Sequence, residues 1–437
     1  MSKRFEYIIN EIQDQYLLGD DDDKPWIVGF SGGKDSTVLL QLVWEALKRL
    51  PEGIVRKREI HVICNDTMVE NPIITEFVSG VLEKIRQAAV EQGMPIFVKE
   101  TTPRLEDSFW LNMLGRGYPV PNNMFRWCTD RLKIRPTSRL LQDQINENGE
   151  AIILLGTRSA ESQTRARSMK KHEVKGSRLT NHGNEKNTKV YAPIKDLMTE
   201  EVWGYINSVP SPWGADNAEL FRIYSDASAD DYECPTVVTT KDHKTCGQSR
   251  FGCWVCTVVK QDKSMTALIE NGLEWMRPML ELRNDFVTER NIRSNRMVKR
   301  RNGSSDSVGP YTPEYRARAL KQLLLAQREI QRSKPHLDLI TKQELVAIQA
   351  VWNRDSIFEH SVSSIYNNVY EKKIAMGKSS EKVEQENALL KKACKSNPKD
   401  FELINQLLIL QKNKSLLNRK RGLKDDIETR IEKALKE

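Results

Sequence analysis

The sequence of 437 residues lacks any run of eighteen apolar residues, and its N-terminus lacks the apolar segment of a secretory signal peptide. We therefore expect a soluble, cytoplasmic protein with no membrane partner. The chain has seven cysteines, and in a reducing compartment we do not expect them to form structural disulfides. The net charge is only +8, so the distribution of charge along the chain says more about partners than the total does.

The sequence also lacks a Walker A phosphate loop, which would need glycine at position 28 and Ser or Thr at position 35, where the chain has Val28 and Asp35. A different glycine turn stands between an apolar segment, 26–28, and a helical pattern. Two adjacent glycines allow a tight turn, so that backbone N–H groups and a helix N-terminus can converge on one phosphate. The residues that we expect to hold this phosphate are Ser31, Gly32, Gly33, Lys34, Asp35 and Ser36.

Strand-like and helical patterns alternate along the first half of the chain. Strands are predicted at 26–30, 59–64, 95–99, 151–156 and 189–194. Helices are predicted at 36–50, 73–92, 131–147 and 199–208. This alternation predicts an α/β fold, a twisted parallel sheet with helices on both faces. Ligands of such sheets bind beyond the carboxyl ends of the strands, near the switch in strand order.

Polar clusters follow two of the predicted strands. Asp66 and Thr67 come after the strand at 59–64, although Asp66 could also serve only as the N-cap of the next helix. The second cluster, after the strand at 151–156, contains Gly156, Arg158, Glu161 and Arg165. Because the carboxyl ends of parallel strands meet at one edge of a sheet, we expect both clusters to lie near the phosphate turn.

A third segment, 125–136, combines aromatic, basic and thiol side chains. Its Arg126, Arg131 and Lys133 are candidate partners for phosphate oxygens. Cys128 lies among them. The sequence leaves three interpretations of Cys128 open: a core cysteine, a sulfur carrier or a ligand of a metal cluster.

Four cysteines lie within 23 residues in the pattern C-x11-C-x6-C-x2-C: Cys234, Cys246, Cys253 and Cys256. Two thiolates at C-x2-C spacing can reach one metal, and two more complete an all-sulfur site. Zinc ribbons use two close pairs, whereas only Cys253 and Cys256 are close here. The pattern therefore favours a 4Fe–4S cluster over a structural zinc and over unligated thiols, which remain the alternatives. We expect Cys64 to lie in the core and Cys394 to have no chemical role.

Residues 31–36 match the PP-loop consensus of the ATP pyrophosphatases at every position. That family cleaves ATP between its α and β phosphates and transfers AMP to a substrate oxygen. The clusters at Asp66–Thr67, Cys128 and Gly156–Arg165 resemble elements of the sulfate-assimilation reductase branch of this family. The resemblance implies an adenine nucleotide α-hydrolase-like fold. It also implies that Arg158 and Arg165 face phosphates, that Glu161 orients an arginine or a metal ion, and that Gly156 lets the nucleotide approach. The residues expected to act in catalysis are Lys34, Asp35, Arg158 and Cys128.

The order of the motifs over residues 20–290 closely resembles the DndC family, the sulfurtransferases of DNA phosphorothioate modification. The segments that carry this likeness include Val190-Tyr-Ala-Pro-Ile, Ser211-Pro-Trp-Gly and Gly252-Cys-Trp-Val-Cys-Thr. The likeness implies ATP, Mg²⁺ and a 4Fe–4S cluster as cofactors. It implies DNA as substrate, a cysteine desulfurase as sulfur donor, and the other proteins of the modification complex as partners.

Three other functions remain open: a tRNA thiolation enzyme, a phosphoadenylyl-sulfate reductase-like enzyme and a non-catalytic DNA-binding scaffold. The reductases normally end in a Glu-Cys-Gly-Leu-His motif, and this sequence contains none.

We expect a PP-loop ATP pyrophosphatase domain at 1–230, an iron–sulfur segment at 231–265, and a basic, α-helical region for DNA or partner binding at 266–437. Helices are predicted at 313–333 and 342–353, and again over 380–437 with a break near 396–398. Two stretches carry an excess of Lys and Arg, +6 over 158–189 and +5 over 277–301. We expect the first to be a lid or binding loop, and both to hold DNA unless their charges are merely solvated.

Overall fold

A computed structural model gives the fold of the chain. It describes residues 3–17, 24–55, 58–161, 163–174, 176–182, 187–226, 252–299, 308–355, 357, 360–372, 388–394, 397–416, 427–428 and 431. The chain forms two compact units. The first contains Met1–Arg104 and Pro121–Leu280, and the second contains Leu105–Val120 and Glu281–Glu437. The domain boundaries expected at 230 and 265 stay a prediction.

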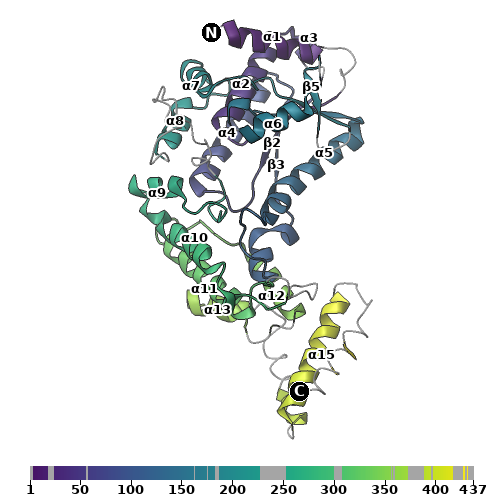
Figure 1. Ribbon diagram of the computed structural model, residues 1–437, viewed down its shortest axis with the longest axis vertical. Coiled ribbons are helices and arrows are strands. Elements are labelled where there is room, and N and C mark those ends of the chain that lie inside the picture. The colour runs from purple at the N-terminus through teal and green to yellow at the C-terminus, as the bar shows by residue number, and fades with distance from the viewer. Residues whose placement is uncertain are drawn as a thin grey trace. The chain divides into compact units, whose positions relative to one another are not determined.

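A six-stranded sheet forms the centre of the first unit (Figure 1). Its strand order is β3-β2-β1-β4-β6-β5. Neighbouring strands are parallel except β5 and β6, which are antiparallel. The strands are β1 (Trp26–Gly29), β2 (Ile60–Asn65), β3 (Ile96–Thr101), β4 (Ala151–Leu154), β5 (Leu179–Asn181) and β6 (Thr188–Tyr191). The predicted parallel α/β sheet is confirmed, and the five predicted strands overlap β1, β2, β3, β4 and β6.

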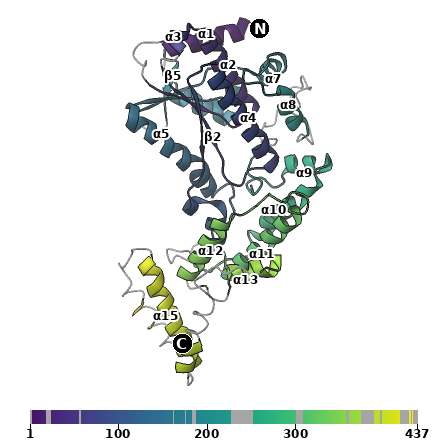
Figure 2. The same cartoon turned by 180° about the vertical axis from the view of Figure 1, so that it is seen from behind.

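Side chains alternate across β1, and both faces of the strand are covered. Trp26 and Val28 pack into a core with helices that include α1 (Lys3–Leu17), α2 (Lys34–Lys48), α4 (Pro72–Glu91) and α7 (Thr199–Ser208). Ile27, between them, packs with Leu141 of α5 (Arg135–Asn148) on the other face. In both views α5 lies across the strands from α4 (Figures 1 and 2).

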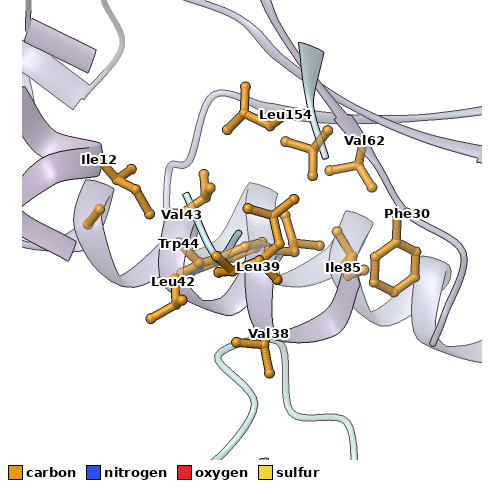
Figure 3. Packing of buried hydrophobic residues seen from close by; sticks show 14 of the residues in the cluster. Ile12, Phe30, Val38, Leu39, Leu42, Val43, Trp44, Val62, Ile85 and Leu154 are labelled. Carbon is orange, nitrogen blue, oxygen red and sulfur yellow. The ribbon is translucent and has the colours of Figure 1, made fainter. Parts of the chain in front are cut away.

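The larger of these cores holds α2 in place. Figure 3 shows Leu39 and Trp44 of α2 in one cluster with Val62 and Leu154 of the sheet. Burial of a side chain such as Leu39 contributes about 1.5–3 kcal/mol. Since α2 begins directly after the phosphate turn, this packing also fixes where the turn lies.

The expectation of a loop over 158–189 is wrong for the described part of that stretch. It contains α6 (Gln163–His172) and the edge strand β5. The sequence of α6, QTRARSMKKH, has no apolar stripe, so periodicity gave no helical signal. The short β5 forms by pairing Thr180 with Val190 of β6. The N-terminal helix α1 was not predicted either.

Three further helices belong to the first unit: α3 (Glu52–Val55), α8 (Asn217–Asp226) and α9 (Lys263–Glu270). A fourth, α10 (Arg277–Glu289), continues from the first unit into the second.

The second unit is helical. Its helices include α11 (Pro313–Ile330), α12 (Lys342–Arg354), α13 (Val362–Tyr370) and α15 (Pro398–Leu416). The predicted helices at 313–333 and 342–353 are confirmed, each with a threonine N-cap, Thr312 or Thr341. Trp352 donates a hydrogen bond to the carbonyl of Leu114 at 2.8 Å, which ties α12 to the segment 105–120. No described helix of the protein is long and apolar enough to span a membrane.

Candidate functional site

The phosphate turn joins the end of β1 to the start of α2. Gly32 has a φ of 72°, and a Cβ at this position would lie 2.2 Å from Cγ2 of Val78, so conformation and space both require glycine. Ser36 Oγ donates to the carbonyl of Gly33 at 2.9 Å and closes the turn. Gly33 is the N-cap of α2 and has no side chain to occupy the first amides of the helix. The helix N-terminus is thus arranged for an anion.

The turn lines a cavity of about 530 Å³ at the carboxyl ends of β1, β2 and β4. In the sheet, β2 and β4 flank β1 on either side, which is the switch in strand order where such sheets bind ligands. The volume lies in the range of ligand pockets, roughly 300–1,000 Å³. The predicted residues that line it are Ser31, Gly32, Gly33, Lys34, Asp35, Ser36, Asp66, Gly156 and Glu161.

Gly156 is required by the protein's own backbone. A Cβ there would lie 2.9 Å from the carbonyl carbon and oxygen of Asp35. The glycine therefore lets the strand end approach the phosphate turn, in addition to lining the cavity. The expectation named only the nucleotide as the group that approaches it.

Arg158 is placed differently from the expectation that it faces a phosphate. Its side chain is fully buried, and its Nε donates to Oδ1 of Asp35 at 2.6 Å. Its Nη1 donates to the carbonyl of Leu197 at 3.1 Å and to Thr199 Oγ1 at 3.3 Å. Arg158 is not among the residues that line the cavity. It acts on the turn through Asp35. Arg165 lies on α6, and its side chain is outside the described part.

Thr67 is also buried and is not among the residues that line the cavity. Its hydroxyl donates to Oε1 of Glu70 at 2.9 Å and lies 3.3 Å from Sγ of Cys253. The same Glu70 oxygen lies 3.7 Å from Nζ of Lys133. Glu70 and Lys133 both line the cavity. The residues around Thr67 therefore connect the cavity to the cysteines.

Three described cysteines gather at this point: Cys128, Cys253 and Cys256. The segment at 253–254 is held beside the chain that follows β2, where Trp254 N–H donates to the carbonyl of Val69 at 3.0 Å. Cys256 N–H donates to the carbonyl of Cys253 at 2.9 Å, which closes the C-x2-C turn. Cys128 comes from the start of a π-helical turn, Thr129–Ile134, that also carries Lys133. The other two predicted ligands, Cys234 and Cys246, lie outside the described residues.

The electrostatics of this group are set by burial and by Lys133. Burial raises the pKa of Cys253 to about 12, with the nearby Glu70 carboxylate adding to it. Burial also raises the pKa of Cys128. Burial opposes the charge of Lys133, but attraction to Cys253, Glu70, Cys128 and Cys256 outweighs it and raises the pKa of Lys133. The ammonium of Lys133 therefore lies within electrostatic reach of all three thiols.

The donor set is all sulfur, which suits iron or zinc. Sulfurs that share one zinc lie about 3.8 Å apart, because each is about 2.3 Å from the metal at a tetrahedral angle. Among the described residues, no three His, Cys, Asp or Glu side chains converge closely enough to hold a single ion. The 4Fe–4S cluster expected from the cysteine spacing therefore stays a prediction. Cys64 lines the cavity from β2, and burial raises its pKa to about 12.

The sequence offered no signal for Tyr224, on α8. Its hydroxyl accepts a hydrogen bond from the N–H of Lys34 at 3.4 Å, and the Lys34 ammonium lies 5.2 Å from the centre of its ring. Tyr224 lines the cavity together with the phosphate turn. It stands 190 residues from Lys34 in the chain, so no local motif could reveal the contact.

The basic stretch at 277–301 is partly structural. Arg283 is fully buried, and Arg296 donates to the carbonyl of Gly309 at 2.7 Å and lies over the ring of Tyr311. Arg277 forms an ion pair with Glu274. The buried Arg283 guanidinium adds nothing to an exposed basic face, and DNA contact by the rest of the stretch stays a prediction. Arg300 and Arg301 lie outside the described residues.

Residues 25–259 match the model of the phosphoadenosine phosphosulfate reductase domain. The match spans the phosphate turn, the cavity and the three grouped thiols. The chain belongs to this family. Members of the family share the PP-loop fold described above, and the predicted fold class is confirmed.

An uncharacterized protein of Methanocaldococcus jannaschii is 28% identical to this chain over 150 residues. The match covers 34% of this chain and 26% of that protein, so this chain spans about a quarter of the length of its relative.

Three solved structures are similar at low identity. The phosphoadenylyl-sulfate reductase of Candida auris, in a phosphate complex, is 13% identical with a TM-score of 0.28, over 48% of this chain and 90% of that one. The U34-tRNA thiolase NcsA of Methanococcus maripaludis, with its 4Fe–4S cluster, is 16% identical with a TM-score of 0.27, over 51% and 72%. The FMN adenylyltransferase of Candida glabrata, with FMN and an ATP analogue, is 13% identical with a TM-score of 0.30, over 56% and 70%.

Proposed function

We propose that the protein is an ATP pyrophosphatase and sulfurtransferase that replaces a non-bridging oxygen of the DNA backbone by sulfur. The observation that carries the proposal is that the cavity and the group of three thiols have two residues in common. Glu70 and Lys133 line the nucleotide-sized cavity and also lie beside the thiol group. A phosphate activated in the cavity would therefore lie next to the sulfur chemistry. The resemblance of the motifs to the DndC family supports DNA as the substrate.

The reaction balances in two steps. A non-bridging oxygen of the DNA phosphate attacks the α-phosphorus of ATP, and pyrophosphate leaves. A sulfide sulfur then attacks the phosphorus of the DNA, and AMP leaves with the original oxygen. Activation is needed because an unactivated phosphodiester oxygen is a very poor leaving group. A cysteine desulfurase supplies the sulfur as a persulfide. Two electrons from a small-molecule thiol, which is oxidised to its disulfide, release that sulfur as sulfide.

Each group of residues has a role in this scheme. The amides of the turn and the Lys34 ammonium hold the phosphates of ATP and offset charge in the transition state. Asp35, held by Arg158, and Asp66 are the carboxylates that would hold Mg²⁺, which neutralises phosphate charge when bound. Cys128, Cys253 and Cys256 would hold a 4Fe–4S cluster, which offers an iron site for sulfur when bound.

Product analysis tests the proposal. The purified protein should convert ATP to AMP and pyrophosphate, and Lys34→Ala should abolish this, whereas Lys48→Ala, at the exposed end of the same helix, should not. Mass spectrometry should find phosphorothioate dinucleotides in host DNA only when the gene is present. ADP as the main product would refute the pyrophosphatase assignment. Sulfur found in tRNA and not in DNA would identify an RNA thiolation enzyme.

A further inference from the structure

A tight turn at 122–125 presents two apolar side chains to solvent beside the thiol group. The side-chain oxygen of Asn122 accepts hydrogen bonds from the N–H groups of Met124 and Phe125, both at 2.8 Å. The backbones of Asn122 and Phe125 also pair in both directions at 3.2 Å. The turn is therefore rigid, yet Met124 is 96% exposed and Phe125 is 44% exposed. Adjacent exposed apolar side chains are a feature of binding surfaces.

The turn is anchored to the cysteine segment. Thr257, the residue after Cys256, donates from its buried hydroxyl to the carbonyl of Pro121 at 2.6 Å. On the other side of the turn, Trp127 is buried and leads directly to Cys128. Both flanks of the turn are thus attached to the segments that carry the thiols. A molecule that touches Met124 and Phe125 would lie next to these sulfurs.

The surroundings of the turn are cationic. Residues 121–140 contain five Lys or Arg and one Asp, all of them described. Asp130 forms an ion pair with Arg135 at 2.9 Å, and the segment as a whole carries an excess of four positive charges, five minus one. Exposed Arg126 directly follows Phe125 and donates to Asn123 Oδ1 at 3.1 Å. An exposed aromatic ring among cations is the arrangement by which proteins hold single nucleotides: the ring stacks on a base and the cations bind phosphates.

We infer that the 122–125 turn is the docking element for the DNA substrate. Phe125 stacks on a nucleobase that is unstacked next to the reacting phosphate, Met124 packs on the same base, and Arg126 binds a neighbouring backbone phosphate. The occupant is a nucleic acid strand because its bases and phosphates match the exposed apolar side chains of Met124 and Phe125 and the adjacent cation of Arg126. This inference rests on the proposed function and names the residues that place its substrate.

Binding of a short oligo(dT) strand and of a duplex of the same length, each measured by fluorescence anisotropy, tests the inference. Phe125→Ala should weaken binding of the strand by roughly 5- to 150-fold, the range found for loss of one base–aromatic stack. Phe125→Leu should also weaken it, because an apolar side chain without a ring cannot stack. Phe97→Ala is the matched control, since Phe97 is 48% exposed at the start of β3, away from the carboxyl ends of the strands. It should bind as the wild type does.

Hydrolysis of ATP to AMP and pyrophosphate without DNA, in which water takes the place of the DNA oxygen, separates this inference from the proposed function. Phe125→Ala should keep that hydrolysis, because the turn does not line the cavity. If Phe125→Ala binds DNA as tightly as Phe97→Ala and still modifies it, the docking role is wrong and the proposed function stands. If the wild-type protein binds tRNA and neither form of DNA, the DNA docking role and the DNA substrate are both refuted.

Discussion

The Nε of Arg158 lies 2.6 Å from Oδ1 of Asp35, although 123 residues separate the two in the chain. Asp35 stands in the first turn of α2, next to Lys34, whose Nζ lies 3.7 Å from the other carboxylate oxygen. Arg158 also binds Leu197 and Thr199. It therefore links the phosphate turn to the segment that leads into α7, and it positions the carboxylate of Asp35.

Replacing Arg158 by Ala should lower both stability and activity. Removing one partner of a buried ion pair leaves the other uncompensated, and the free energy of unfolding should fall by about 2–3 kcal/mol. This loss is smaller than is typical for a fully buried ion pair, because Asp35 is 21% exposed and partly screened by water. Activity should fall mainly in kcat for pyrophosphate release, because the arginine orients a residue of the turn and does not line the ATP cavity. Urea unfolding and steady-state kinetics measure the two effects.

Arg158→Lys and Arg167→Ala complete this test. Lysine keeps the charge but lacks the planar group that reaches Asp35 and Leu197 together, so the first variant should lose most of the activity. Arg167 is exposed on α6 and should tolerate alanine. A large rise in KM for ATP with unchanged stability would show instead that Arg158 touches the phosphates.

Gly32→Ala should prevent the phosphate turn from binding ATP, whereas Gly80→Ala should leave ATP binding unchanged. The φ of 72° at Gly32 costs a residue with a Cβ about 1–2 kcal/mol, and the contact of 2.2 Å with Val78 adds to this. A Cβ at Gly80, inside α4, meets nothing within 4 Å. Alanine there should raise stability by about 0.5–1 kcal/mol. Thermal unfolding with and without ATP measures both the stability and the binding of ATP. A rise in unfolding temperature on addition of ATP to Gly32→Ala as large as that of the wild type would refute the anion-binding role of the turn.

Stability should fall at alkaline pH in a way that depends on Cys64. An unfolded cysteine has a pKa of about 8.5, and burial raises the pKa of Cys64 to about 12 in the folded protein. The neutral thiol is thus favoured by folding, and its contribution is complete below pH 8.5 and lost as pH rises towards 12. In urea unfolding at a series of alkaline pH values, the free energy of unfolding should fall less steeply with pH for Cys64→Val and Cys64→Ala than for the wild type. Equal slopes would contradict a buried, neutral Cys64.

Protein purified without oxygen should be brown and contain iron. Serine at Cys128, Cys253 or Cys256 should bleach it, because a missing thiolate leaves an iron without its ligand. Cys394→Ser should keep the colour. Iron analysis and visible absorption measure the effect, and one zinc per chain would refute the cluster.

The ligand set itself can be decided by the same measurement. The spacing of the sequence predicts Cys234, Cys246, Cys253 and Cys256, whereas the structure groups Cys128 with the last two. Loss of iron in Cys128→Ser but not in Cys234→Ser would support the group seen in the structure. The opposite pattern would support the spacing.

The sequence by itself determined the parts of this protein whose signals are local. The glycine turn, the strand before it and the helix after it are contiguous, so their residue types alone predict a phosphate site. The apolar runs of β1, β2 and β4 likewise predict a parallel sheet, since each is buried on both faces. The threonine N-caps at Thr312 and Thr341 mark two helices for the same reason: the group that begins the helix is adjacent to it.

Only the tertiary structure decided which distant residues meet. From the sequence, Arg158 is expected to face a phosphate near a strand end. In the fold its side chain is buried and bonded to Asp35. From the sequence, Arg283 belongs to a basic stretch expected to be exposed, but its side chain is buried in the fold. The segments of Cys128 and of Cys253 and Cys256 come together through long-range contacts: Cys253 pairs with Glu70, 183 residues away, and Thr257 bonds to Pro121, 136 residues away. Such pairings depend on the summed packing of whole helices and strands, and no spacing of residues along the chain encodes them.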